Sequence, residues 1–377
     1  MNSAKTLLPL LSALLWALPV AAEGWAETAG AGRAVAQARL PAGFQLSLYT
    51  SRTPDARSMA LGDDGTLYVG TRDQGKVYAV RDHDGDGQGE QVITVAAGLN
   101  YPNGVAFYQG ALYVAEVQRI LRYRQIGADP AHPPRPVVVY DQLPHDIHHG
   151  SRYLRAGPDG KLYLGIGMPC NVCLPPREVY GSLARLDPDG THFEIIAQGI
   201  RNSVGFDWQP DTGALYFTDN GRDRLGDDLP PEELNRLEQP GQHFGFPYCH
   251  AGQLADLQFG QGRSCREFTP PLWRFPAHAA PLGLRFYTGA SFPAAYRGQL
   301  FVAQHGSWNR SVPQGYRVAL VRFEQGVPVS EAVFVDGWLN RDGHALARPV
   351  DILQMPDGSL LVSDDMNGAI YRIRYGG

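Results

Sequence analysis

The sequence has no excess of basic residues. Its 33 Lys and Arg residues stand against 38 Asp and Glu residues, which gives a formal net charge of −5. A surface that binds nucleic acid needs clustered positive charge, and this balance offers none, so we expect no nucleic-acid partner. An acidic, solvated surface accounts for the charge without a charged partner.

Long helical periodicity is also missing, and the apolar stretch from Leu7 to Val20 is too short for a comfortable membrane span. Lys5 precedes this stretch, and small residues end it at Val20-Ala21-Ala22. This pattern is typical of a secretory signal. We predict a signal peptide over residues 1–22, a flexible Ala/Gly-rich leader over residues 23–39, and a periplasmic or secreted mature chain without a membrane span.

Cysteine is scarce, with only four residues in the chain. No His follows Cys173, which argues against covalent haem attachment. An even number of cysteines in an exported chain favours disulfides, and we expect Cys170 to pair with Cys173 and Cys249 with Cys265. A redox pair at Cys170 and Cys173, or a zinc site formed by all four cysteines, are the alternatives.

A turn of the Pro-Asp-Gly kind followed by a β-rich run returns six times. The copies are Gly65 to Val69, Gly110 to Val114, Gly160 to Leu164, Gly213 to Phe217, Gly298 to Val302 and Gly358 to Val362. Their leucines are 45, 50, 53, 85 and 60 residues apart, in the range of propeller blades. We therefore predict an all-β, six-bladed β-propeller over residues 40–377.

The strand that precedes the first copy has a separate role. Phe44, Leu46 and Leu48 alternate there with polar residues or Tyr, as in a half-buried strand. A ring of blades must close, because a free sheet edge invites aggregation. We expect this strand to complete the sixth blade.

Basic and amide side chains recur just upstream of the copies, where the rim of the central channel is expected. They include Arg57, Asn103, His149, Arg201-Asn202 and Arg348. Converging arginines suit an anionic, oxygen-rich ligand, because guanidinium groups bind carboxylates in bidentate fashion. The alternative is that these arginines tie the blades together.

Several longer motifs carry a family resemblance. They are His149-Gly-Ser-Arg152-Tyr-Leu, Gly199-Ile-Arg201-Asn202, Thr218-Asp-Asn-Gly-Arg-Asp, Asp227-Asp-Leu-Pro-Pro-Glu-Glu-Leu-Asn235, His305-Gly-Ser-Trp-Asn-Arg310 and Arg348-Pro-Val-Asp351. In this order they resemble the glucose/sorbosone dehydrogenase family, six-bladed quinoproteins that use pyrroloquinoline quinone (PQQ). The likeness runs from about Leu40 to Tyr375 and is greatest to the sorbosone dehydrogenase branch.

The resemblance implies roles for individual residues. His149 falls on the catalytic histidine, which removes the substrate hydroxyl proton. Arg201 and Arg348 match arginines that contact the cofactor, and Asn202 donates a hydrogen bond to the quinone oxygen. Ca²⁺ is bound partly through backbone carbonyls, here those of Gly221 and Arg222.

Two neighbours of His149 receive subsidiary expectations. His148 points the other way on a strand and is structural. Asp146 is a carboxylate that could orient the His149 ring.

The chain departs from the glucose-oxidising members at two places. They carry Pro after the Gly of the calcium loop, where this chain has Arg222. They also place a lysine near the cofactor in the fifth blade, where this chain has the segment His305 to Arg310. His305 or Arg310 supplies that charge here, and Trp308 offers a face for stacking on the cofactor ring or the sugar.

One hairpin could bind metal by itself. Asp82-His-Asp84-Gly-Asp86-Gly87 matches the opening of an EF-hand loop, but Ile93 stands at position twelve in place of the bidentate Glu. A plain hairpin turn and a loosely held surface calcium are both open.

Together these features predict an exported PQQ-dependent dehydrogenase that oxidises a hydroxyl or hydrated aldehyde of a small sugar. Its electrons leave through a separate acceptor, since no haem attachment motif is present. A calcium-dependent lactonase of the gluconolactonase-like propeller type shares the fold, but it needs carboxylates converging on a channel metal. A non-enzymatic binding propeller needs an exposed aromatic or apolar patch.

Overall fold

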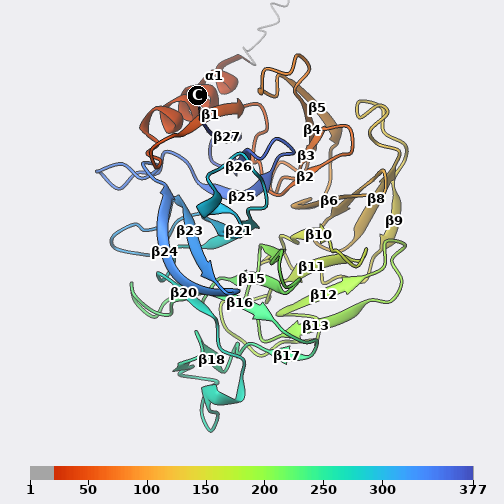
Figure 1. Cartoon of the computed structure of the whole chain (residues 1–377). Helices are drawn as coiled ribbons and strands as arrows, with labels where there is room; N and C mark the ends of the chain where they lie inside the picture. The colour runs from red at the N-terminus through yellow and green to blue at the C-terminus, as the bar shows by residue number, and fades with distance from the viewer. Residues whose placement is uncertain (1–20, 377) are drawn as a thin grey trace, which may run out of the picture.

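A computed structural model describes residues 21–376, with side chains from residue 29 on. Six sheets, each with four antiparallel strands, are arranged as blades around a common centre (Figure 1). The first strands of neighbouring blades contact one another, with β10 and β14 joined by the hydrogen bond from Arg155 to Asp207, and β25 contacts β2 where the ring closes. This arrangement confirms the predicted six-bladed β-propeller.

The blades are built in chain order, and each runs from its first, innermost strand outward. Blade 1 is β2 (Met59–Leu61), β3 (Leu67–Val69), β4 (Val77–Arg81) and β5 (Gln91–Ala96); blade 2 is β6 (Gly104–Tyr108), β7 (Ala111–Ala115), β8 (Ile120–Arg124) and β9 (Val137–Tyr140); blade 3 is β10 (Leu154–Ala156), β11 (Leu162–Ile166), β12 (Ser182–Leu186) and β13 (Glu194–Gln198). Blade 4 is β14 (Phe206–Trp208), β15 (Leu215–Asp219), β16 (Glu232–Leu237) and β20 (Trp273–Phe275); blade 5 is β21 (Pro281–Phe286), β22 (Leu300–Gln304), β23 (Arg317–Glu324) and β24 (Val327–Val335); blade 6 is β25 (Pro349–Gln354), β26 (Leu360–Asp364), β27 (Ala369–Tyr375) and β1 (Phe44–Thr50).

The repeated phrase is the turn between the first two strands of each blade. All six of its glycines have positive φ, from 70° at Gly213 to 84° at Gly65, a conformation that strains other residues. The leucine that follows each turn is buried, between 0% and 5% exposed. The repeat therefore marks one tight hairpin and one core position in every blade.

The ring is closed by the N-terminal strand. β1 pairs with β27 in antiparallel register from Phe44↔Tyr375 to Thr50↔Ile370, so the chain's first strand is the outermost strand of the last blade. The prediction that Phe44, Leu46 and Leu48 complete the sixth blade is confirmed.

The leader expected to be flexible is instead helical. α1 (Ala21–Gln37) packs against β1 and β27. Ala31 and Ala34 are fully buried in the core of blades 5 and 6, and Trp338 Nε1 donates to the Ala34 carbonyl at 3.2 Å. The predicted signal peptide lies outside the described residues except for Ala21 and Ala22, and its cleavage stays a prediction.

An insertion between β16 and β20 explains the 85-residue spacing. It carries β17 (Gln242–His243), which adds a parallel fifth strand to blade 3, the small sheet of β18 (Cys249–His250) and β19 (Leu254–Ala255), and the 3₁₀ turn Cys265–Glu267. A second 3₁₀ turn, Ala294–Tyr296, lies in blade 5. The Cys249–Cys265 disulfide closes the insertion, and Cys170 is bonded to Cys173, so both predicted pairings are confirmed.

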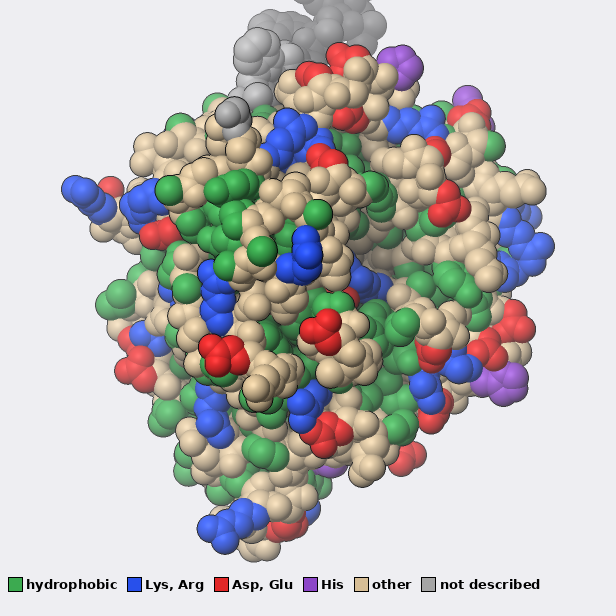
Figure 2. Space-filling view, in the orientation of Figure 1, with side chains coloured by type: hydrophobic (Ala, Val, Ile, Leu, Met, Phe, Trp, Pro, Cys, Tyr) green, Lys and Arg blue, Asp and Glu red, His purple; other side chains and the backbone are tan. Residues whose placement is uncertain are grey.

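Basic and acidic side chains are interspersed on the face shown in Figure 2. In the part of the chain that the structure describes, no helix is both long and apolar enough to cross a membrane.

Candidate active site

The segments that lead into the innermost strands enclose two adjoining cavities. The wide cavity, about 330 Å³, is lined by residues that precede or begin the first five blades, among them Arg57, Tyr101, His149, Asn202 and Leu282. The narrow cavity, about 130 Å³, is lined among others by Arg201, Gly221, Glu232 and Trp308. His149 and Asn202 line both cavities, so this pair marks where they meet.

His149 is held as a neutral imidazole. Its Nδ1 lies 2.8 Å from the Met168 carbonyl oxygen, which can only accept, so Nδ1 carries the proton and Nε2 keeps a free lone pair. Burial, together with the charges of Arg201 and His148, holds the His149 pKa well below its usual value of 6.5. The residue is therefore suited to accept a proton through Nε2.

The backbone at His149 is strained. Its φ of 51° lies in the left-handed region, which costs a residue with a Cβ roughly 1–2 kcal/mol. Gly150 completes the tight turn by donating its N–H to the Ile147 carbonyl at 2.8 Å. Such strain persists only where surrounding contacts enforce it, and it concentrates at functional sites.

The left-handed turn corrects our expectation for His148. The two imidazoles do not point apart: their ring centroids lie 4.1 Å apart. Asp146 does not orient His149 either, because it accepts a hydrogen bond from the Tyr180 hydroxyl. The group that orients the His149 ring is the Met168 backbone.

Gly167 leaves space for the side chains of His149 and Asn202. A Cβ at Gly167 would lie 2.5 Å from the His149 Cβ and 2.9 Å from Asn202 Oδ1. We expect Gly167→Ala to displace His149, lower the free energy of unfolding by roughly 1–3 kcal/mol, as overpacking does, and reduce turnover more than tenfold. Denaturant titration and steady-state kinetics measure both effects. Gly127→Ala, whose nearest neighbour would be 3.7 Å away, is the matched control; equal effects in the two variants would contradict this interpretation.

Arg201 is a buried cation at the floor of the narrow cavity. Nε donates to Asn171 O at 2.9 Å, Nη1 to Asn220 O at 3.1 Å, and Nη2 to Asn171 Oδ1 and Asp223 Oδ2 at 3.0 and 2.9 Å. Burial lowers its pKa, and the Asp223, Glu232 and Asp219 carboxylates oppose that shift. A guanidinium has five N–H donors, so one N–H of Nη1 is left for a ligand.

Asp219, the last residue of β15, fixes the backbone of the Arg201-Asn202 pair. Its two carboxylate oxygens accept the Arg201 and Asn202 N–H groups at 2.9 and 2.7 Å. Within residues 29–376, no hydrogen bond is made by the Asn202 side-chain amide, which lines both cavities. This amide is therefore available to a ligand.

The loop after β15 presents the predicted calcium carbonyls. Gly221 lines the narrow cavity, and its N–H donates to Glu232 Oε2 at 2.5 Å. The carbonyl oxygens of Gly221 and Arg222 accept no backbone hydrogen bond among the residues described. Arg222 turns its guanidinium to Asp256. Burial raises the pKa of Glu232 to about 8.

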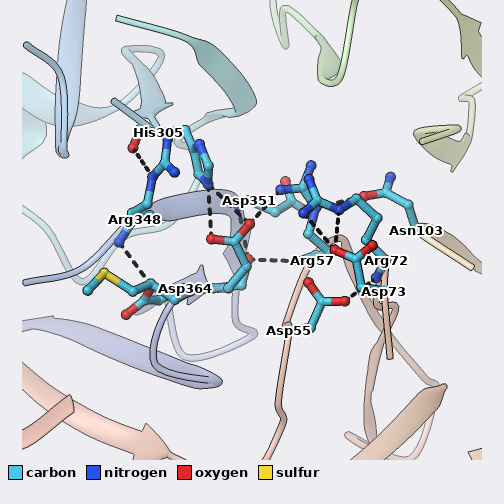
Figure 3. A network of polar contacts seen from close by, with 12 residues as sticks. Asp55, Arg57, Arg72, Asp73, Asn103, His305, Arg348, Asp351 and Asp364 are labelled. Atoms are coloured by element: carbon cyan, nitrogen blue, oxygen red, sulfur yellow. Dashed lines mark hydrogen bonds and ion pairs between the residues drawn. The ribbon is translucent and has the colours of Figure 1, made fainter. Parts of the chain in front are cut away.

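A second polar network (Figure 3) includes Arg57, Arg72 and His305, which line the wide cavity. Asp365 accepts from Arg57 Nη1 at 2.8 Å and from His305 Nε2 at 2.9 Å. Burial raises the pKa of Asp365, but the His305 and Arg57 charges outweigh it and hold that pKa well below its usual range. Arg72 is paired with Asp73 at 2.7 Å. Both arginines of this cavity are thus balanced by a carboxylate.

Of the other predicted site residues, His305 lines the wide cavity and Trp308, which is 71% exposed, lines the narrow one. Arg348 lines neither: it donates to the carbonyls of His305 and Gly306, at 3.3 and 2.9 Å, and its guanidinium lies over the Tyr316 ring. Arg310 is bound to the Asp227 carbonyl and the Asp228 carboxylate. The structure therefore brings His149, Arg201, Asn202, Gly221, His305 and Trp308 together, but it places Arg348, Arg310 and the Arg222 side chain in bracing contacts.

The EF-hand-like loop lies apart from these cavities, between β4 and β5. Ligand oxygens of Asp82, Asp84, Asp86 and Glu90 lie within 4.8 Å of one another, and this is the only such group of three or more among the residues described. The carboxylates accept backbone N–H groups of their own turn, such as Gly85 N–H at 2.8 Å. Calcium binding there stays a prediction.

Comparison with known proteins identifies relatives. The family model described as TrAA12-like matches residues 182–376, just over half of the chain. An uncharacterized protein of Borreliella burgdorferi is 32% identical over 89% of this chain and 90% of its own length. The pyrroloquinoline quinone-dependent pyranose dehydrogenase of Coprinopsis cinerea is 31% identical over 56% of this chain, which corresponds to 37% of that longer protein.

A solved structure has the same fold. The calcium structure of a Trichoderma reesei member of carbohydrate-active enzyme family AA12 superposes with a TM-score of 0.79 at 22% identity, over 90% of this chain and 97% of the other.

Proposed function

Because this chain belongs to the TrAA12-like family, we propose that it is an exported PQQ-dependent dehydrogenase that oxidises a hydroxyl or hydrated aldehyde of a sugar. The observation that carries the proposal is the junction of the two cavities. There the neutral His149 imidazole, with its free Nε2, meets the unpaired Asn202 amide. A base for the hydroxyl proton and a hydrogen-bond donor for the oxygen that gains negative charge are what the protein must contribute when a bound acceptor takes the hydride of an alcohol.

His149 Nε2 removes the proton of the substrate hydroxyl. When bound, PQQ supplies an acceptor for the hydride that leaves the carbon bearing this hydroxyl. The substrate therefore loses two electrons and two hydrogens. The Met168 carbonyl stabilises the resulting imidazolium, because it accepts a hydrogen bond from Nδ1–H. The electrons then leave through a separate acceptor.

The polar groups of the narrow cavity suit one carboxylate or quinone oxygen of PQQ and a calcium ion beside it. The buried, positively charged guanidinium of Arg201 offers one N–H, and the Asn202 amide makes no hydrogen bond among the residues described. The free carbonyls of Gly221 and Arg222 are hard oxygen ligands of the kind that Ca²⁺ prefers. Trp308, exposed at this cavity, offers an aromatic face for the sugar or the cofactor.

Export is part of the proposal. The apolar segment from Leu7 to Val20, the small residues up to Ala22 and the two disulfides suit a periplasmic or secreted protein. Mass spectrometry of the exported protein should find a chain that begins near Glu23 with no free thiol; four free thiols would contradict this prediction.

The proposal is tested by adding PQQ and Ca²⁺, separately and together, to the purified protein. We expect Ca²⁺ to bind much more tightly once PQQ is present and PQQ affinity to rise by the same factor, because coupling between two ligands is reciprocal. Dye reduction across a panel of aldoses and aldehydes then reports dehydrogenase activity. Tight calcium binding without PQQ, together with lactone hydrolysis, would instead identify a lactonase.

The His149 pKa gives a test that needs no cofactor. We expect one of the 11 histidine signals in an NMR titration to disappear in His149→Ala, and to titrate below pH 6.5 in the parent. The unfolded chain binds this proton near pH 6.5 but the folded chain only at lower pH, so acid below pH 6.5 favours unfolding through this residue. A His149 signal that titrates at or above pH 6.5 would contradict the neutral-base assignment.

A further inference from the structure

The loop between β11 and β12 contains a short covalent ring. Residues 168–173, here named the disulfide loop, end in the Cys170–Cys173 bond. Met168 is buried with Tyr180 and Phe246, and Val172 and both cysteines pack against that cluster. The loop is thus anchored on one side by an apolar core and closed on itself by the disulfide.

Asn171 lies inside this ring, and its polar groups form hydrogen bonds with Arg201 and with the backbone of Asp223. Its backbone carbonyl accepts from Arg201 Nε at 2.9 Å, and its Oδ1 accepts from Arg201 Nη2 at 3.0 Å. The same Oδ1 accepts the Asp223 N–H at 2.8 Å, and Nδ2 donates to the Asp223 carbonyl at 3.2 Å. One side chain therefore joins the buried guanidinium to the loop that carries Gly221 and Arg222.

The disulfide loop also contacts His149. The Met168 carbonyl accepts a hydrogen bond from His149 Nδ1 at 2.8 Å, and the Met168 N–H donates to the Arg201 carbonyl at 2.9 Å. The His148 ring lies against that of His149, with the two centroids 4.1 Å apart. The base, the cofactor-facing arginine and the calcium-loop backbone are thus held by one six-residue segment.

We propose that Asn171, held in place by the Cys170–Cys173 disulfide, is a positioning residue that sets Arg201 and the 221–223 backbone for the cofactor. The inference rests on the proposed function, because it concerns affinity for PQQ. Burial makes the position of Arg201 consequential: a buried guanidinium must satisfy its N–H groups within the protein, and Asn171 accepts two of the four hydrogen bonds that it makes.

The disulfide matters because Asn171 lies in a loop and not in a strand. A free loop that must hold an asparagine side chain and its backbone carbonyl in one arrangement loses conformational entropy on doing so. The covalent ring removes much of that freedom before any ligand arrives. Preorganisation of this kind strengthens binding without adding a contact to the ligand.

The experiment compares Asn171→Ala with Asn340→Ala in the full chain. Asn340 also accepts two backbone N–H groups, those of Asp342 and His344, in a loop that lines neither cavity. We expect Asn171→Ala to weaken PQQ binding about 10- to 100-fold, the range seen when the outer partner of a ligand-holding group is lost. Turnover at saturating PQQ should stay within a few-fold of the parent, because the Met168 contact to His149 is intact.

A second measurement needs no cofactor. Hydrogen exchange should speed up in the peptide that contains the Asp223 amide in Asn171→Ala and stay at the parental rate in Asn340→Ala. Asn171→Asp keeps an acceptor oxygen for that amide, so it should restore the protection. Cys170→Ser combined with Cys173→Ser leaves Asn171 in place and should change exchange and affinity in the same direction as Asn171→Ala, which keeps the test decisive if the alanine variant fails to fold.

The two proposals fail in different ways. If the parent protein binds no PQQ, the proposed function is wrong. Hydrogen exchange at the Asp223 amide would still show whether Asn171 holds this backbone. Unchanged exchange and unchanged PQQ affinity in Asn171→Ala, or changes no larger than those of Asn340→Ala, would overturn the inference.

Discussion

Replacing His149 with Ala should leave PQQ bound and reduce turnover about 10²- to 10⁴-fold, the range for loss of a general base. The variant removes the Nε2 lone pair at the junction of the cavities but leaves the Arg201 and Asn202 donors in place. Steady-state kinetics with sugar and dye, beside a PQQ titration of the same preparation, separate the two effects.

His148→Ala is the matched control. His148 is exposed and lines neither cavity, although its ring lies next to that of His149. We expect the control to turn over within a few-fold of the parent. If His149→Ala also oxidises sugars within a few-fold of the parent, another group is the base.

Replacing Arg201 with Ala should have the second large effect. The variant removes a buried cation and leaves the Asp223 carboxylate and the Asn171 acceptors without their partner. It also removes the cation that faces the cofactor, and losing one partner of a desolvated charged contact costs roughly 2–5 kcal/mol, so PQQ affinity should fall about 30-fold or more. Isothermal titration of the cofactor-free protein measures the change directly.

The Arg348→Ala variant tests whether Arg348 binds PQQ or only holds neighbouring blades together. Family resemblance gives Arg348 the same role as Arg201, but its contacts are backbone carbonyls and the Tyr316 ring. We therefore expect Arg348→Ala to lower the melting temperature while PQQ affinity stays within a few-fold of the parent. Equal losses of affinity in both variants would restore the role implied by the resemblance, and no loss in either would mean that both arginines only brace the blades.

The repeat made the architecture predictable because each blade needs the same turn and the same buried leucine. α1 was not predictable in this way. Its glycines suggest a flexible segment, but Gly30 permits close approach to Asn367, since a Cβ there would lie 2.3 Å from Asn367 Oδ1. The helix is stabilised by packing against blades 5 and 6, a contact that local composition does not encode.

The site was predictable where one motif carries both a side chain and its role, as at His149 and at Arg201-Asn202. It was not predictable where partners come from distant blades. Asp365 and Arg57 are 308 residues apart in sequence and yet form one ion pair. Strand alternation also misplaced His148, because the left-handed residue that follows it ends the alternation.

The pairing of β1 with β27 sets an order of events during synthesis. β1 is among the first parts of the propeller to leave the ribosome, but its partner comprises residues 369–375, so the two cannot meet until all six blades have been synthesised. Until then both strands present unpaired backbone groups, even if blades 1 to 5 have already formed as local hairpins. The ring of blades therefore stays open in the nascent protein. In a chain that stalls or is truncated before β27, the first strand remains an unpaired edge that can pair with other molecules and cause aggregation.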